Sequence, residues 1–244
     1  MNKEKPISFN SKMKNVSYFF QVLARDINEI TFFNDLFNYA VSELDLKQLE
    51  IRKELASKKG ESSLEGIILL HLANENHIKL MNQFNLTYLN TIFESYLFNI
   101  VRYQLLKHKG LLGKIEVSPE ELYSLSTYKI IDKKIDKVTQ NIIYGSYSRI
   151  VSNIDKKFGL KLNETINKEE LEQLDDFKEA RNIITHRKTK INLLTNQSSN
   201  LIKKTTFFEE EIVYYPEYIE NFRKVIVKVA QKIDSFICEI NPEL

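Results

Sequence analysis

A segment near residue 180 gathers side chains whose types suit proton transfer and phosphate binding. Glu179, Asn182 and His186 are separated by three, four and seven positions, so a helix turning about 100° per residue puts them on one face. Histidine suits proton transfer because the ordinary pKa of an imidazole lies near neutrality. Arg181 adds a permanent charge and a planar fork that fits phosphate oxygens.

Arg181 also stands where an apolar residue is expected, about 20° from Leu174 on the same helix. A buried guanidinium needs a partner, because an isolated buried charge is very unfavourable. The apolar helix expected over residues 89–105 contains the matching anomaly, since Glu94 falls within its apolar arc in line with Val101. We therefore predict a buried ion pair between Glu94 and Arg181.

The string RNIITH at 181–186 resembles the R-x4–6-H motif of the HEPN superfamily, many of whose members cleave RNA without a metal. Further similar features are FGLKL upstream, the acidic lead-in EELEQLDDFKEA, the helix bearing Glu94 and a long amphipathic helix near residue 240. The resemblance covers about residues 85–240. It implies an all-α, HEPN-like helical bundle.

The resemblance implies a mechanism in which the 2′-hydroxyl of RNA attacks its own phosphodiester. Such a reaction needs a base, an acid and positive charge at phosphorus. Arg181, Asn182 and His186 are then the catalytic residues, with Glu94 and Glu179 supporting them. Products would be a 2′,3′-cyclic phosphate and a 5′-hydroxyl, with no cofactor or metal.

The family solution is a homodimer, since one chain offers a single such histidine and a two-fold contact brings two together. We expect apolar residues such as Ile183 to flank that interface. A local basic rim would contact the RNA backbone without reading its sequence; its members are Lys178, Arg187, Lys188 and Lys190. Arg187, Lys188 and Lys190 equally fit an ordinary solvated helix end.

The resemblance further implies a toxin or an anti-phage defence effector, with an antitoxin or another defence subunit as a partner. Two departures limit it. Glu94 is followed by SYLFN instead of the Lys-Arg pair of some members, and Lys188 stands where many toxins have a tyrosine. Two other functions stay open: a non-catalytic HEPN-like module binding RNA or nucleotide, and a structural subunit of a defence complex.

Scarce glycine and proline, with apolar residues every three or four positions, predict helices around this site. We expect one or two over 14–57, two over 64–108 interrupted near Asn85, and others at about 137–158, 168–188 and 217–239. Ser118 to Glu121 forms a capping box, and residues 191–215 suit a short hairpin or an extended segment. Residues 1–60 are expected to be a helical extension to a 61–244 domain, unless the two form one compact domain.

Composition excludes several classes. Lys plus Arg total 35 against 33 for Asp plus Glu, so any nucleic-acid binding must come from a local patch. Cys238 is the only cysteine, which excludes a disulfide scaffold and favours a reducing, cytoplasmic setting. The four histidines lack metal-ligand spacing. No apolar run reaches the roughly 18 residues of a membrane span, and the basic start lacks the apolar core of a signal peptide.

Overall fold

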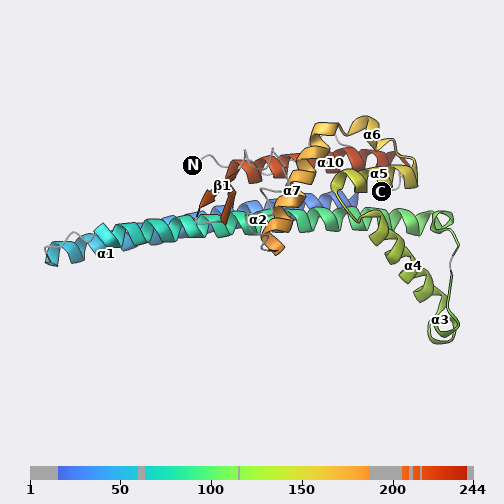
Figure 1. Cartoon of the computed structure of the whole chain (residues 1–244), viewed down its shortest axis with the longest axis horizontal. Helices are drawn as coiled ribbons and strands as arrows, with labels where there is room; N and C mark the ends of the chain where they lie inside the picture. The colour runs from blue at the N-terminus through green and yellow to red at the C-terminus, as the bar shows by residue number, and fades with distance from the viewer. Residues whose placement is uncertain are drawn as a thin grey trace.

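The computed structural model describes residues 16–59, 64–114, 116–186, 205–208, 211–214 and 216–240 (Figure 1). It gives the backbone alone for residues 51–59, 64–79, 186, 216 and 240, for both strands and for several positions between 38 and 49. The helices are α1 (Tyr18–Lys59), α2 (Leu64–Lys107), η1 (Lys109–Leu112), α3 (Pro119–Ser124), α4 (Thr127–Ile142), α5 (Tyr147–Phe158), α6 (Leu162–Thr165), α7 (Lys168–His186) and α10 (Pro216–Ile240).

The fold is helical, as predicted, with one short hairpin. Strands β1 (Thr205–Phe208) and β2 (Glu211–Tyr214) pair antiparallel, with Thr205 opposite Tyr214. They form a two-stranded sheet beside the long helices (Figure 1). No described helix is both long and apolar enough to cross a membrane.

The helices α1 and α2 run side by side as a long hairpin whose far end projects from the rest of the molecule (Figure 1). We call the projecting part, residues 31–59 and 64–88, the arm. The body is formed where α7 and α10 pack against α2, with α5 against α7 and the first part of α1 against α10. Fully buried aromatic side chains from five helices fill its core: Phe20, Phe93, Tyr147, Phe177 and Phe222.

Helix α1 contributes directly to this core, because its Leu23 and Ile27 are buried in the same cluster as Leu97 and Ile233. The start of α1 is fixed by Asp234 of α10. Asp234 accepts hydrogen bonds from the Ser17 hydroxyl and from the Ser17 backbone N–H, the latter at 3.0 Å. Ser17 also caps α1 by accepting from the N–H of Phe20.

Two predicted helix boundaries were wrong. The expected break near Asn85 is absent from α2, which runs unbroken from Leu64 to Lys107 with the Asn85 side chain buried; tertiary packing outweighs the low helix propensity of asparagine. The helix expected at about 137–158 is two helices. Gly145 adopts a φ of 108° and Ser146 caps α5, so the chain turns between Ile142 and Tyr147.

At other helix ends, the capping signals in the sequence predicted the boundary correctly. The capping box of Ser118 and Glu121 is confirmed at the start of α3. Gly159 takes the left-handed conformation that ends α5. The sequence left Asn167 and Thr165 open as caps for α7, and Asn167 is the residue that caps it.

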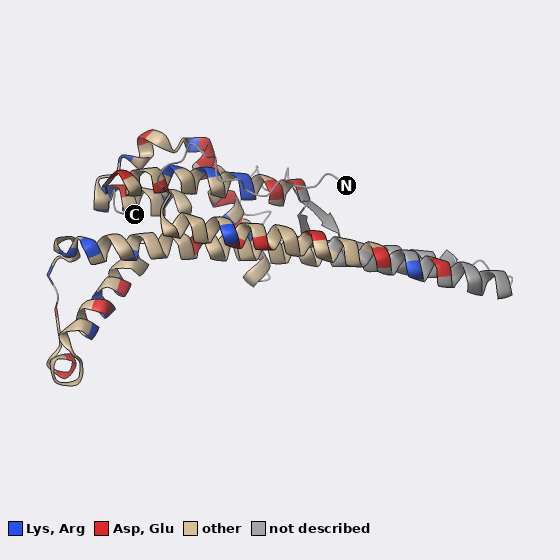
Figure 2. Ribbon diagram, turned by 180° about the vertical axis from the view of Figure 1, so that it is seen from behind, with Lys and Arg blue, Asp and Glu red and all other residues tan. Residues whose placement is uncertain are grey.

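Charges of both signs are distributed along α4 and α10 (Figure 2). Among the described ion pairs, Arg102 bridges Asp132 and Asp136 of α4, and Arg223 pairs with Glu220 within α10. The described surface of these two helices is therefore mixed in sign, in agreement with the nearly balanced composition of the chain.

Candidate functional site

Helix α7 carries the RNIITH segment and is fixed at its first turn. Asn167 accepts from the N–H of Glu170 at 2.8 Å, and the Glu170 carboxylate accepts from the N–H of Asn167 at 3.0 Å, which closes a capping box. Glu170 is buried and bound by two cations of α10, Lys228 at 2.7 Å and Lys232 at 2.6 Å. These contacts fix where α7 begins, and therefore where its C-terminal residues lie.

The apolar stripe of α7 then holds the helix against α2, α5 and α10. Leu174, Phe177, Ala180 and Ile183 are all buried. Phe177 stacks on Phe222 of α10 with ring centres 4.1 Å apart. Because Ile183 belongs to this stripe, it packs inside the protomer, and the expectation that it lines a dimer interface was wrong.

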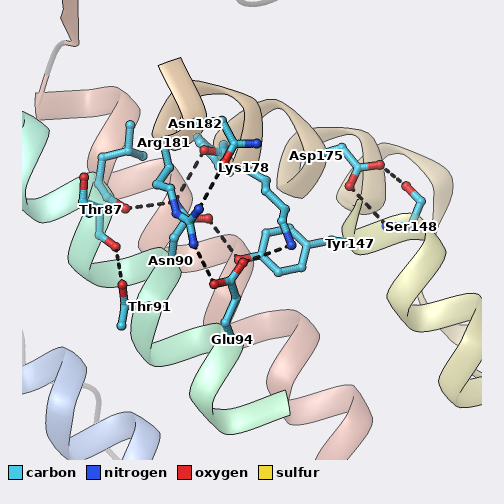
Figure 3. A network of polar contacts seen from close by, with 12 residues as sticks. Thr87, Asn90, Thr91, Glu94, Tyr147, Ser148, Asp175, Lys178, Arg181 and Asn182 are labelled. Atoms are coloured by element: carbon cyan, nitrogen blue, oxygen red, sulfur yellow. Dashed lines mark hydrogen bonds and ion pairs between the residues drawn. The ribbon is translucent and has the colours of Figure 1, made fainter. Parts of the chain in front are cut away.

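The predicted contact between Glu94 and Arg181 is confirmed. Nη2 of Arg181 donates to Oε2 of Glu94 at 2.8 Å, and Nζ of Lys178 lies 3.0 Å from Oε1 of the same carboxylate (Figure 3). One carboxylate of α2 thus binds two cations of α7. We call Glu94, Lys178 and Arg181 the ion cluster.

The ion cluster is less buried than the sequence suggested. The side chains of Glu94 and Arg181 keep 27% and 23% of their surface exposed. The helical pattern correctly gave the direction of both side chains but not their depth, because both project at the edge of the α2–α7 contact. A partly exposed guanidinium is held in place by Glu94 and is still open to solvent.

Asn182 extends the ion cluster along α7. Its Oδ1 accepts from Nη1 of Arg181 at 3.1 Å, so Glu94 and Asn182 hold the guanidinium from two sides (Figure 3). Two of the five N–H donors of Arg181 are used in these contacts. These contacts fix the plane of the fork, and the exposed part of the guanidinium can meet a ligand.

Lys178 is held against α5 and was misplaced by the sequence. Its Nζ lies 4.7 Å from the centre of the Tyr147 ring, a cation–π distance, and its side chain is only 15% exposed. The sequence put Lys178 on a basic rim around the site. In the structure Lys178 is a member of the ion cluster, because it contacts both the carboxylate of Glu94 and the face of the Tyr147 ring.

Sequence reasoning missed Tyr147 and Asn90. The ring of Tyr147 packs under Lys178 of the ion cluster, and Asn90 binds the Tyr147 hydroxyl. The Tyr147 hydroxyl donates to Oδ1 of Asn90 at 3.0 Å, and Asn90 donates to the carbonyl of Leu86 at 2.9 Å (Figure 3). Burial and the neighbouring Glu94 carboxylate raise the pKa of Tyr147 well above 10.0. Its phenol is protonated near neutrality, as that of an ordinary tyrosine is, and it serves as a donor to Asn90. No signal in YGSYS marks this role.

A second contact ties α5 to α7 close to the ion cluster. Asp175 accepts hydrogen bonds from the hydroxyl and from the backbone N–H of Ser148, the latter at 3.2 Å. Ser148 lies in the first turn of α5, where a carboxylate is favoured by the helix dipole. Asp175 thereby fixes Tyr147, the neighbouring residue, relative to α7.

His186 is the last residue of α7, so its backbone stays in helical register with Glu179 and Asn182. Its side chain lies outside the described part of the structure, as do Arg187, Lys188 and Lys190. Glu179 is half-buried and joins none of the described contacts of the ion cluster. The roles assigned to these residues stay predictions.

The described residues offer few other features of a ligand site. They contain no group of three or more His, Cys, Asp or Glu side chains that could hold a metal. A pocket of about 410 Å³ lies at the end of α2, lined by Gln104, His108, Gly110, Leu111 and Phe158. None of the predicted site residues lines it.

No protein-family model, curated protein or solved structure matches the chain significantly.

Proposed function

We propose that this chain is a metal-independent, HEPN-like endoribonuclease that works as a homodimer in the cytoplasm, as a toxin or an anti-phage effector. The observation that carries the proposal is that two hydrogen bonds fix the orientation of the Arg181 guanidinium. Glu94 and Asn182 orient a partly exposed guanidinium on the helix that ends in His186. An oriented, partly exposed fork suits a phosphate that gains charge in a transition state.

In this mechanism His186 removes the proton from the 2′-hydroxyl, and the second copy of His186 in the dimer protonates the leaving 5′-oxygen. Arg181 binds the phosphate. Glu94 and Asn182 act as positioning residues, because they contact the guanidinium and set its plane. Arg187, Lys188 and Lys190 would hold the flanking RNA backbone without reading its sequence.

A second candidate is a non-catalytic HEPN-like module that binds RNA or nucleotide, or a structural subunit. One observation favours it: both described cations of α7 in this region, Lys178 and Arg181, already share the carboxylate of Glu94. The sole role of such a cluster would then be to hold α7 against α2. The two candidates differ in whether RNA is cut.

The deciding experiment incubates the purified full chain with end-labelled transfer RNA and messenger RNA in excess EDTA. We expect cleavage that leaves a 2′,3′-cyclic phosphate and a 5′-hydroxyl. His186→Ala should abolish it. His108→Ala is the matched control, since His108 is exposed beside η1 at the far end of α2. Binding without cleavage by the wild type supports the second candidate, and equal cleavage by wild type and His186→Ala excludes His186 from the reaction.

A further inference from the structure

One face of α2 is exposed and carries no charge. Between positions 80 and 101 the only charged residue is Glu94. Every exposed residue of α2 from position 80 to 95 falls on a single stripe spaced by three or four positions, which is one side of a helix: Leu80, Phe84, Tyr88, Thr91 and Ser95. Soluble helices normally cover such a face with charged side chains.

Large apolar side chains of α1 continue this face. Helical spacing puts Phe32, Leu36 and Tyr39 on one stripe of α1. Phe33 joins the two helices, because its ring centre lies 6.5 Å from that of Phe84. Phe84 in turn stacks on Tyr88 at 5.7 Å. We call the combined surface the arm face; its large apolar members are Phe32, Phe33, Leu36, Tyr39, Leu80, Phe84 and Tyr88.

The exposed area of the arm face is comparable with that of a protein–protein interface. These seven residues are each 39–70% exposed. Since a large aromatic side chain presents about 150–250 Å², together they expose roughly 700 Å² of surface. The largest apolar patch of a typical monomer is about 300–600 Å², and a standard dimer buries about 800 Å² per partner.

We propose that the arm face is the surface through which two copies of this chain associate. A second copy fits it for two reasons. The face is mainly apolar, its α2 stripe is uncharged and Asp35 is the exposed charge on its α1 stripe; such a face can pack against its own copy, as a two-fold contact requires. Charge depletion with aromatic enrichment is also the composition of an interface core. A nucleic acid does not fit, because no described cation lies on the α2 stripe.

The location of the arm face links it to the ion cluster. Thr91 of the uncharged stripe lies three positions before Glu94 on α2, so the stripe passes about 60° around the helix from the residue that holds Arg181 (Figure 3). This inference deepens the proposed function, because it names the surface of the dimer that the two-histidine mechanism needs. Ile183 cannot provide that surface, since it is buried in the protomer.

Sedimentation of the full chain across micromolar concentrations tests the proposal without any RNA. We expect a concentration-dependent dimer. Phe84→Glu should weaken association by roughly tenfold or more, because it places a charge at the centre of the face. Tyr123→Glu is the matched control, since Tyr123 is a 93% exposed aromatic residue on α3, and it should leave association unchanged.

Circular dichroism should show equal helicity in both variants, since both positions are exposed. A second variant, Leu80→Glu, should repeat the effect of Phe84→Glu. A wild type that stays monomeric at every concentration overturns the proposal and leaves another protein or another segment of this chain as the occupant. Dimers that survive both glutamate substitutions overturn it as well. A dimer that cuts no RNA supports the arm face and contradicts only the proposed function.

Discussion

Nη2 of Arg181 donates to Oε2 of Glu94 over 2.8 Å, although the two residues lie 87 positions apart in the chain. Lys178 occupies the other oxygen of the same carboxylate. Glu94 is therefore the one described anion that keeps two cations of α7 from repelling each other. Removing its charge has consequences for stability and for the orientation of Arg181.

Glu94→Gln should lower the free energy of unfolding by about 2 kcal/mol, because Lys178 and Arg181 would lose their shared counter-charge. The value is moderate because the cluster is partly exposed. Urea unfolding followed by circular dichroism measures it. Glu94→Gln combined with Arg181→Met should recover part of the stability and none of the RNA cleavage. Simple addition of the two single losses would show that the residues are not coupled.

Tyr147→Phe should lower the free energy of unfolding by about 1–2 kcal/mol, because Oδ1 of buried Asn90 would lose its donor. Tyr147→Leu should cost about 3–4 kcal/mol, since it also removes ring packing against Phe93 and Lys178. Tyr144→Phe, at a 73% exposed tyrosine, is the control and should be neutral. Equal losses for Phe and Leu at position 147 would mean that the ring contributes nothing beyond its hydroxyl.

Stability should fall in acid partly through Glu170. Burial alone would raise its pKa, but hydrogen bonds from Lys228 and Lys232 outweigh burial and hold the pKa below 4.5. Because this pKa is lower in the folded state than in the unfolded state, the ionised Glu170 side chain stabilises the fold at pH values above the unfolded-state pKa. The stabilisation is lost as the pH falls below 4.5 and through the folded-state pKa. Thermal melts from pH 6 to pH 3 should show this loss.

Glu170→Gln should reduce the melting temperature at pH 6 by a few degrees, about what 1–2 kcal/mol produces in a chain of this size. It should also flatten the acid limb of the stability profile. Glu172→Gln is the control, because Glu172 is exposed and pairs only with exposed Lys168 among the described residues. If both variants keep the wild-type acid limb, other carboxylates carry the pH dependence.

Cys238 should react slowly with a thiol reagent in the folded protein. Burial and the nearby Asp234 carboxylate raise its pKa to about 11, so little thiolate forms near pH 8. The reaction should become fast in guanidinium chloride, and one thiol per chain should be counted. Ser17→Ala should speed labelling of the folded chain, because Ser17 binds Asp234 beside the thiol. Immediate labelling of the wild type would contradict a closed α1–α10 contact.

The features predicted correctly from the sequence are local or involve an obvious mismatch. Ser118 and Glu121 identify a capping box because both partners lie within one turn. Glu94 and Arg181 could be paired across 87 positions because each is a charge in an otherwise apolar arc, and burial needs compensation. Helical periodicity gave the direction in which these side chains point.

The features that were missed depend on tertiary packing. Tyr147 reads as one aromatic residue among many, and only the fold brings its hydroxyl to Asn90, 57 positions away. Lys178 reads as a solvated cation until α5 supplies the ring beneath it. Ile183 reads equally well as core or interface, since apolar spacing does not say which neighbour covers it. The turn at Gly145 was hidden inside a periodic stretch.

The contact of Ser17 with Asp234 joins the start of α1 to α10, 217 positions later. At a synthesis rate of roughly 5–20 residues per second, the contact between α1 and α10 therefore forms on the order of ten seconds or more after Ser17 is made. In that interval α1 can already pack against α2, but the side of α1 that meets α10 stays uncovered. Folding of this body is consequently a late event, which makes the growing polypeptide a natural client for chaperones that bind exposed apolar helices.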